Sequence, residues 1–344
     1  MKIFLLSLLF CLTCGACVNT NIGNQDQNGA DGSDSIQAAP ADTTSNYGSP
    51  FYTPPTPPQP RKTLGVALGG GGAKAAAEIG VLKMIDEEGI IVDCIAASSM
   101  GAFVGCLYAA GFSAKEIEDI WYNEEWVRLI DRDATVTEKE RSFIGVIGGD
   151  EFEEHLRDLL STKNCTTFEQ TKIPFECTAT EVIDKHQLQK QVLSTGDLPR
   201  AVRASLTFPF PIAGYQPVEL NGKWLVDGGM FNNLPLDLVE QKNVEQIIAV
   251  DLETTHNSPH FTPEFKSLTK ILPWLANWAR SRPDTERHKL NKEKAMNRYI
   301  YINPRLNGYS ILDFSRKKAE QLILLGENAM KRKNNELRKI KGIL

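Results

Sequence analysis

The sequence predicts an α/β protein with a mostly parallel central sheet, because apolar runs of strand length alternate with stretches of helical periodicity. Two of these runs, residues 63–68 and 92–97, lead directly into turns of small residues, and a helical pattern follows each turn. A third run, residues 245–252, is apolar along most of its length, which is typical of a buried parallel strand.

The composition is that of a globular protein, since 42% of the 344 residues are hydrophobic and 24% are charged. The net charge is −5, and no run is basic enough for a nucleic-acid-binding surface. Seven cysteines are too few for a disulfide scaffold. These values exclude a disordered chain, a multi-span membrane protein and a partnership with nucleic acid.

Residues 1–16 are predicted to be a signal peptide. A charged start precedes an apolar run over residues 3–14, which is too short to span a hydrocarbon core of about 30 Å. Gly15-Ala16-Cys17 resembles the processing site of bacterial lipoproteins, although Cys14 stands where an aliphatic residue is usual. We expect an exported lipoprotein anchored through Cys17 at the periplasmic face or in the outer membrane. An ordinary cleaved signal is the alternative.

Residues 17–60 are predicted to be a tether between this anchor and the folded body. From residue 18 on, the stretch has no Lys or Arg and is rich in Asn, Ser, Thr and Pro. It cannot bury enough apolar surface to offset its chain entropy, so we expect disorder. Residues 61–344 show no internal repeat and no second low-complexity break, which predicts one domain.

Further elements of this domain follow from local patterns. Asp150 opens a helix with Phe152 and Leu156 on its apolar face. Residues 175–184 and 185–194 are predicted to be paired strands, and a helix near 314–333 closes the chain.

Four of the cysteines lie in this domain. Cys94 and Cys106 fall in a predicted strand and helix, where buried free thiols are expected. The sequence leaves open whether Cys165 and Cys177 form a disulfide.

A glycine-rich loop, Gly69 to Gly72 followed by Ala73 and Lys74, lies between the first strand and the first helix. Glycines let the backbone approach a ligand, and the helix N-terminus directs free N–H groups at negative charge. The loop lacks the Gly-Lys-Ser/Thr pattern of a P-loop and the distal acid of a dinucleotide site. It therefore predicts an anion hole that is not committed to phosphate.

A second small-residue turn, Ala97-Ser98-Ser99-Met100-Gly101, follows the second strand. It matches the nucleophile elbow G-x-S-x-G except that Ala97 replaces the first glycine. Such a turn presents the Ser99 hydroxyl beside the N-terminus of the following helix. The alternative is a purely structural serine.

A third motif, Asp227-Gly228-Gly229, follows the apolar residues 224–226. An acid before two glycines is often only a turn, but it also suits a general base held at a strand end.

The three motifs in this order resemble those of the patatin-like phospholipase family, over about residues 64–326. Residues 198–205 and Pro209 also resemble the family's sequence before its aspartate. The resemblance implies a patatin-like three-layer α/β/α sandwich and a serine hydrolase that cleaves acyl esters of lipids, of phospholipase A, lysophospholipase or esterase type. It implies no metal and no cofactor. It further implies these roles: nucleophile Ser99, base Asp227, oxyanion hole Gly70, Gly71 and Gly72, and supporting positions Lys74, Ala97, Gly101, Gly228 and Gly229.

Two other functions stay open. One is an α/β-hydrolase with a Ser-Asp-His triad, in which His256 or His260 follows Asp227 in the required order. These two histidines lack the third ligand of a metal site. The other is a non-catalytic, lipid-binding surface lipoprotein. Residues 267–280 are predicted to form an apolar helix that either faces a membrane or packs on the core.

Overall fold

The computed structural model describes residues 61–123, 150–183, 188–207, 217–252, 298–311 and 313–341. The chain divides into the units Met1–Thr56 and Pro57–Leu344, and all described residues belong to the second. Several predictions from the sequence lie outside the described residues: the signal peptide, Cys17, the tether, Pro209, the 267–280 helix, and the two histidines of the alternative triad, His256 and His260.

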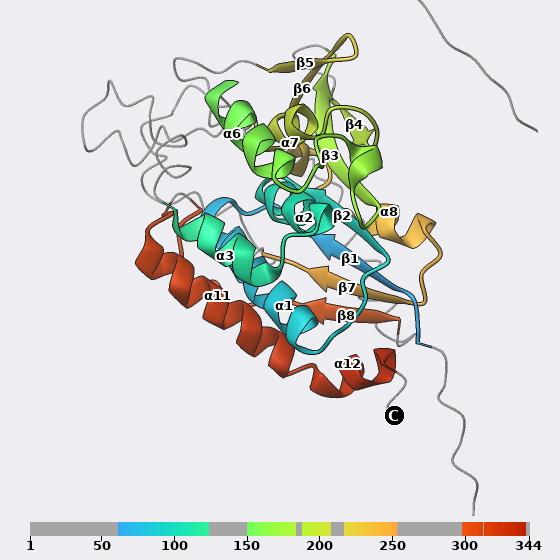
Figure 1. Cartoon of the computed structure of the whole chain (residues 1–344), viewed down its shortest axis with the longest axis vertical. Coiled ribbons are helices and arrows are strands. Elements are labelled where there is room, and N and C mark those ends of the chain that lie inside the picture. The colour runs from blue at the N-terminus through green and yellow to red at the C-terminus, as the bar shows by residue number, and fades with distance from the viewer. Residues whose placement is uncertain are drawn as a thin grey trace, which may run out of the picture. The chain divides into compact units, whose positions relative to one another are not determined.

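An eight-stranded mixed sheet forms the centre of the described part of the chain (Figure 1). The strands are β1 (Leu64–Leu68), β2 (Cys94–Ser98), β3 (Phe175–Val182), β4 (Leu188–Leu193), β5 (Val218–Leu220), β6 (Lys223–Asp227), β7 (Gln246–Val250) and β8 (Tyr299–Ile302). Parallel pairings join neighbours in the order β3-β2-β1-β7-β8. The strands β4, β5 and β6 add antiparallel pairings beyond β3. The predicted mostly parallel sheet is thus confirmed, with an antiparallel extension.

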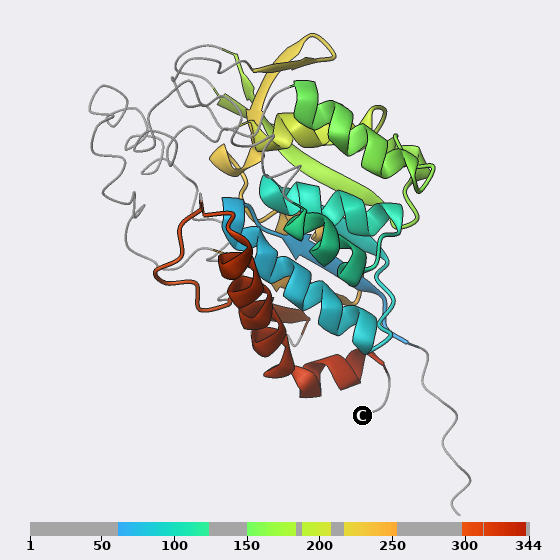
Figure 2. The same ribbon diagram turned by 60° about the vertical axis from the view of Figure 1, so that its left-hand side comes forward.

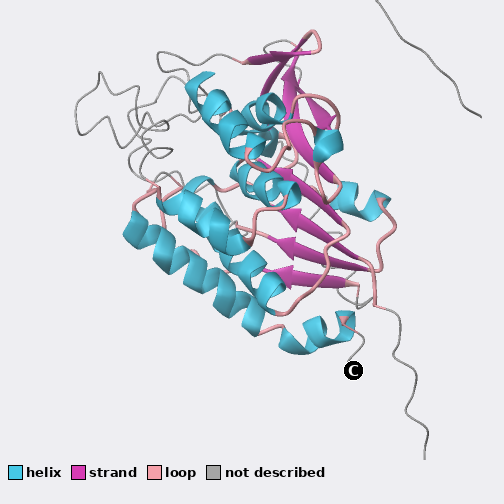
Figure 3. Cartoon of the chain, viewed as in Figure 1, coloured by secondary structure: helices cyan, strands magenta, loops and turns pink. Residues whose placement is uncertain are grey.

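Helices cover both faces of the sheet, which confirms a three-layer α/β/α fold (Figures 1 and 3). The helices are α1 (Ala76–Glu87), α2 (Met100–Ala110), α3 (Ala114–Tyr122), α6 (Asp150–Ser161), α7 (Leu198–Leu206), α8 (Leu236–Gln241), α11 (Arg316–Lys331) and α12 (Asn334–Ile340). Three short 3-10 helices are η1 (Gly72–Ala75), η2 (Phe168–Gln170) and η3 (Gly228–Met230). The helix α11 packs along α1 (Figure 2). None of the helices in the described ranges is both long and apolar enough to cross a bilayer.

The alternation of β1 decides which layer lies on which face. Leu64, Val66 and Leu68 point into the large core beneath α1, α2 and α11. Ala67 points to the opposite face, where α8 packs through Leu236 and its apolar neighbours. Side chains of a strand alternate between faces, so the large residues of β1 meet one layer and the small ones meet the other.

Most predicted elements are confirmed, but the structure also contains helices and strands that were not predicted. The runs 63–68, 92–97 and 245–252 correspond to β1, β2 and β7, residues 175–194 hold the antiparallel pair β3 and β4, and the predicted closing helix is α11. The prediction missed α3, which the capping box of Ser113 and Glu116 begins. The strands β5 and β8 and the helices α7, α8 and α12 were also not predicted, and α12 rather than α11 is the last described helix.

Candidate active site

The serine turn and the acidic turn meet because β2 and β6 lie end to end along one edge of β3. The other edge of β3 is occupied over Cys177–Val182 by β4. On the shared edge, Ser98 at the end of β2 pairs with Thr178. The next residue of β3, Ala179, pairs with Asp227 at the end of β6. Strand pairing therefore places the residues that follow Ser98 beside Asp227.

Ser99 and Asp227 form a direct hydrogen bond across this junction. The Ser99 hydroxyl donates to Asp227 Oδ2 at 2.6 Å. The other carboxylate oxygen, Oδ1, accepts from the N–H of Gly229 at 2.7 Å. Asp227 is only 4% exposed, and Ser99 is half-buried. One oxygen of the carboxylate is thus held by a backbone amide while the other faces the hydroxyl.

The backbone of Ser99 has the strained geometry of a tight strand-to-helix turn. Its φ of 51° and ψ of −132° are unfavourable for a residue with a side chain, which costs on the order of 1–3 kcal/mol. Ser99 also caps α2, and its carbonyl accepts from the N–H of Ala102 at 2.7 Å. The hydroxyl therefore lies at a helix N-terminus, which favours negative charge.

The backbone of Asp227 is anchored at both its N–H and its carbonyl. Its N–H donates to the carbonyl of Thr207 at 2.7 Å, and its carbonyl accepts from Thr180 Oγ1 at 2.9 Å. Thr180 is fully buried within β3. Neither threonine was predicted, because no local sequence pattern points to them.

Two hydrogen bonds join the glycine-rich loop to Asn233, which follows the acidic turn. The N–H of Gly70 donates to the Asn233 carbonyl at 3.0 Å, and Asn233 Nδ2 donates back to the Gly70 carbonyl at 3.0 Å. Gly70 was expected to donate to an oxyanion, but its N–H is already engaged. Within the described ranges, the N–H groups of Gly71 and Gly72 have no acceptor.

Two of the loop's glycines are required by close contacts. A Cβ on Gly70 would lie 2.7 Å from Ser99 Cβ and 2.4 Å from Asn233 Oδ1. Gly72 has φ +56°, and a Cβ there would lie 2.2 Å from the Ile311 carbonyl oxygen. Only glycine lets this loop approach Ser99 so closely.

The supporting residues of the first two motifs lie around this loop. Lys74 is half-buried in η1, and Ala97 is fully buried in β2. Gly101, the second residue of α2, lies directly against the loop, since a Cβ there would lie 2.6 Å from the Gly69 carbonyl oxygen. The smallness of Ala97 and Gly101 therefore serves packing around the turn.

The two glycines after Asp227 act differently. Gly229 supplies the N–H that holds the carboxylate. Gly228 lets η3 pass close to β3, because a Cβ there would lie 2.1 Å from the Thr178 carbonyl oxygen.

A buried acid, Glu78, lies in α1 behind the glycine-rich loop. It is fully buried, and neither carboxyl oxygen has a hydrogen-bonding partner among the described residues. The nearby N–H of Gly69 donates to the Val250 carbonyl instead, at 3.1 Å. Burial raises the pKa of the Glu78 carboxyl well above its ordinary value of 4.5.

The described ranges hold no group of three or more His, Cys, Asp or Glu side chains that could bind a metal ion. The cysteines Cys94, Cys106, Cys165 and Cys177 are buried free thiols, so Cys165 and Cys177 are not bonded to each other. Burial raises the pKa of the Cys94 thiol to about 11. A protonated thiol is a poor nucleophile, which sets Cys94 apart from the exposed type of reactive cysteine.

Comparison with known proteins agrees with this arrangement of fold and motifs. The family model of the patatin-like phospholipases matches residues 66–239, about half of the chain. This protein therefore belongs to the patatin-like phospholipase family.

Two of its relatives are much longer proteins. Lysophospholipase NTE1 of Saccharomyces cerevisiae is 30% identical over 300 residues, which cover 77% of this chain and 16% of NTE1. Human patatin-like phospholipase domain-containing protein 6 is 27% identical over 246 residues, covering 70% of this chain and 17% of that protein. The chain thus spans about a sixth of the length of these curated relatives. A solved structure of ExoU from Pseudomonas aeruginosa aligns with TM-score 0.44 and 15% identity, covering 82% of this chain and 53% of ExoU.

Proposed function

We propose that this protein is a serine hydrolase that cleaves acyl esters of lipids, with Ser99 as nucleophile and Asp227 as general base. The 2.6 Å hydrogen bond from the Ser99 hydroxyl to the Asp227 carboxylate carries the proposal. Family membership and the lysophospholipase named among the relatives support a lipid ester as the substrate class. The reaction uses no metal and no cofactor.

In the first half-reaction, Ser99 Oγ attacks the ester carbonyl carbon while its proton passes to Asp227 Oδ2. Collapse of the tetrahedral intermediate breaks the ester C–O bond, and the leaving alcohol takes the proton from Asp227. Water then attacks the acyl carbonyl carbon while Asp227 again accepts a proton. Collapse of this second intermediate breaks the bond to Ser99 Oγ and releases the fatty acid, and Ser99 Oγ takes the proton back from Asp227. The hydrogen bond from Gly229 to Asp227 Oδ1 keeps the carboxylate pointed at the reacting atoms.

The negative charge that develops on the carbonyl oxygen needs prepositioned donors. The N–H group of Gly70 already donates to the Asn233 carbonyl, whereas those of Gly71 and Gly72 have no acceptor among the residues that the structure describes. We therefore assign Gly71 and Gly72 as the donors to this oxygen. The N-terminus of α2 adds a favourable field at the same place. Removing one donor of an oxyanion hole costs about 10²–10³ in rate.

Labelling with a fluorophosphonate probe tests this function. The wild-type protein is expected to be labelled on Ser99 and to hydrolyse a lysophospholipid and a short p-nitrophenyl ester. The variants Ser99→Ala and Asp227→Asn are each expected to lose hydrolysis while keeping the folded far-UV spectrum. A wild-type protein that takes no label and cleaves neither ester contradicts the proposal and favours a lipid-binding role.

For the N-terminus, we propose that Cys17 carries the lipid that anchors the exported protein to a membrane. The sequence Gly15-Ala16-Cys17 supports this modification, and buried acyl CH₂ groups contribute about 0.8 kcal/mol each to anchoring. Metabolic labelling with an alkyne-tagged fatty acid, followed by membrane fractionation, tests it. Cys17→Ser is expected to lose the label and keep esterase activity, whereas a label that survives the change contradicts the anchor.

A further inference from the structure

The C-terminal end of α7 contacts the backbones of both Ser99 and Asp227. The Ser205 hydroxyl accepts from the Ser99 N–H at 2.9 Å, and the Thr207 carbonyl accepts from the Asp227 N–H at 2.7 Å. Ser205 is fully buried and Thr207 nearly so. These two acceptors lie two residues apart on one helix end, so the same rigid element holds the backbones of the proposed nucleophile and base.

The Ser99 N–H depends on this contact because, among the described strands, sheet pairing provides no acceptor for it. The paired residues of β2 end at Ser98. The following N–H turns away with the positive φ of Ser99 and finds its acceptor in a side chain 106 residues further along the chain. A strained backbone conformation persists only where its surroundings hold it in place.

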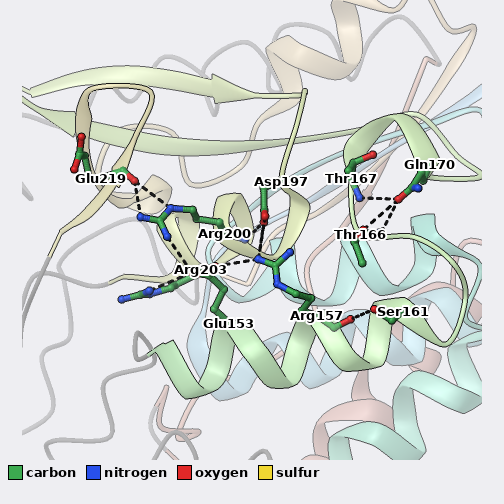
Figure 4. A network of polar contacts seen from close by, with 10 residues as sticks. All are labelled: Glu153, Arg157, Ser161, Thr166, Thr167, Gln170, Asp197, Arg200, Arg203 and Glu219. Carbon is green, nitrogen blue, oxygen red and sulfur yellow. Dashed lines mark hydrogen bonds and ion pairs between the residues drawn. The ribbon is translucent and has the colours of Figure 1, made fainter. Parts of the chain in front are cut away.

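The helix α7 is itself firmly placed by a network of charged side chains, shown in Figure 4. Arg203 contacts Glu153 of α6 at 3.1 Å, and Arg157 of α6 contacts Asp197 at 2.9 Å. Asp197 also caps α7 by accepting from the Arg200 N–H at 2.9 Å. Because α6 and the cap fix α7 at its start and middle, its far end is a stable point of attachment.

We propose that Ser205 is a positioning residue for the hydrolysis proposed above: its hydroxyl holds the Ser99 turn so that Ser99 Oγ meets Asp227. The proposal rests on that function. It also gives a role to the end of residues 198–205. This segment resembles the family, although none of its residues is among the proposed reacting groups. Ser205 touches no reacting atom, so its effect is on geometry alone.

The variant Ser205→Ala removes the acceptor with little change in volume. We expect kcat on a p-nitrophenyl ester to fall on the order of 10- to 100-fold, because a misplacement of about 1 Å is enough for such a loss. KM should not change, since Ser205 does not contact substrate. The rate of fluorophosphonate labelling of Ser99 should fall in parallel with kcat.

Ser98→Ala is a matched control. It deletes a hydroxyl that is equally buried and adjacent to Ser99, but that has no hydrogen-bonding partner among the described residues. Its kcat should equal that of the wild type. Ser205→Cys keeps a weak acceptor and should give an intermediate kcat. It also serves as the test variant if Ser205→Ala does not fold, which thermal melting will show.

The outcomes separate this inference from the proposed function. The positioning role is supported if the wild type turns over the ester and kcat decreases from the wild type to Ser205→Cys and further to Ser205→Ala. Wild-type turnover with an unchanged kcat in Ser205→Ala, or with a change in KM alone, overturns the positioning role and leaves the function standing. A wild type without turnover or labelling overturns both.

Discussion

The Cα of Gly70 packs against the side chain of Ser99, so closely that a Cβ on Gly70 would lie 2.7 Å from Ser99 Cβ. Nothing but hydrogen fits between the glycine-rich loop and the serine turn. The two motifs are therefore parts of one site, and the size of a single residue sets the distance between them.

Gly70→Ala is the first test of this contact. The added methyl must push the loop away from Ser99, which we expect to lower kcat/KM by about 10²-fold or more. Gly89→Ala is the control, because Gly89 has φ +60° but no atom within 4 Å of an added Cβ. It should lose about 1 kcal/mol of stability and no activity. Equal activity of the two variants contradicts the close contact.

Asn233 should be needed for the geometry of the loop. Asn233→Ala removes the hydrogen bond from Nδ2 to the Gly70 carbonyl, and we expect kcat to fall about 10-fold. Asn233→Asp should lose more, because a carboxylate oxygen then faces that carbonyl. The neighbouring Asn232 donates to Asp237 instead, so Asn232→Ala is the matched control. The measurement is kcat from steady-state kinetics, at a temperature below the melting points of all the variants. An equal kcat in Asn232→Ala and Asn233→Ala contradicts this role of Asn233.

No histidine should take part in the reaction. Ser99 Oγ contacts Asp227 Oδ2 directly at 2.6 Å, which leaves no place for an imidazole between them. We therefore expect the double variant His256→Ala/His260→Ala to keep most of its esterase activity. If it is as inactive as Ser99→Ala, the Ser-Asp-His triad replaces the dyad.

Glu78 should make the protein less stable as pH rises. Its folded pKa is raised above the ordinary 4.5 by burial, so its contribution is fully present below about pH 4.5. The contribution is then lost as pH rises towards the folded pKa, because the native state must keep its proton. Glu78→Gln has no proton to lose, so its melting temperature relative to wild type should increase between pH 5 and pH 8. A difference that does not vary with pH contradicts a raised folded-state pKa of Glu78.

The sequence by itself determined the strand–turn–helix order, the three motifs, most of the strands and the helices α1, α2, α6 and α11. These features depend on local properties: the periodicity of apolar residues, the φ preferences of glycine, and the small residues a tight turn requires. For this reason the glycine-rich loop, the Ser99 turn and the Asp227 turn were all predicted at strand ends, and each lies at one.

Only the tertiary structure decided which groups meet within the site. Ser99 and Asp227 are 128 residues apart, and Gly70 and Asn233 are 163 apart. Their contacts follow from the pairing of β1 with β2 and of both β2 and β6 with β3. A local pattern cannot tell whether an N–H already has an acceptor, which is why Gly70 was expected to be an oxyanion donor. Ser205 could not be predicted from local sequence either, because its hydroxyl gains its role only when folding places it at the Ser99 N–H.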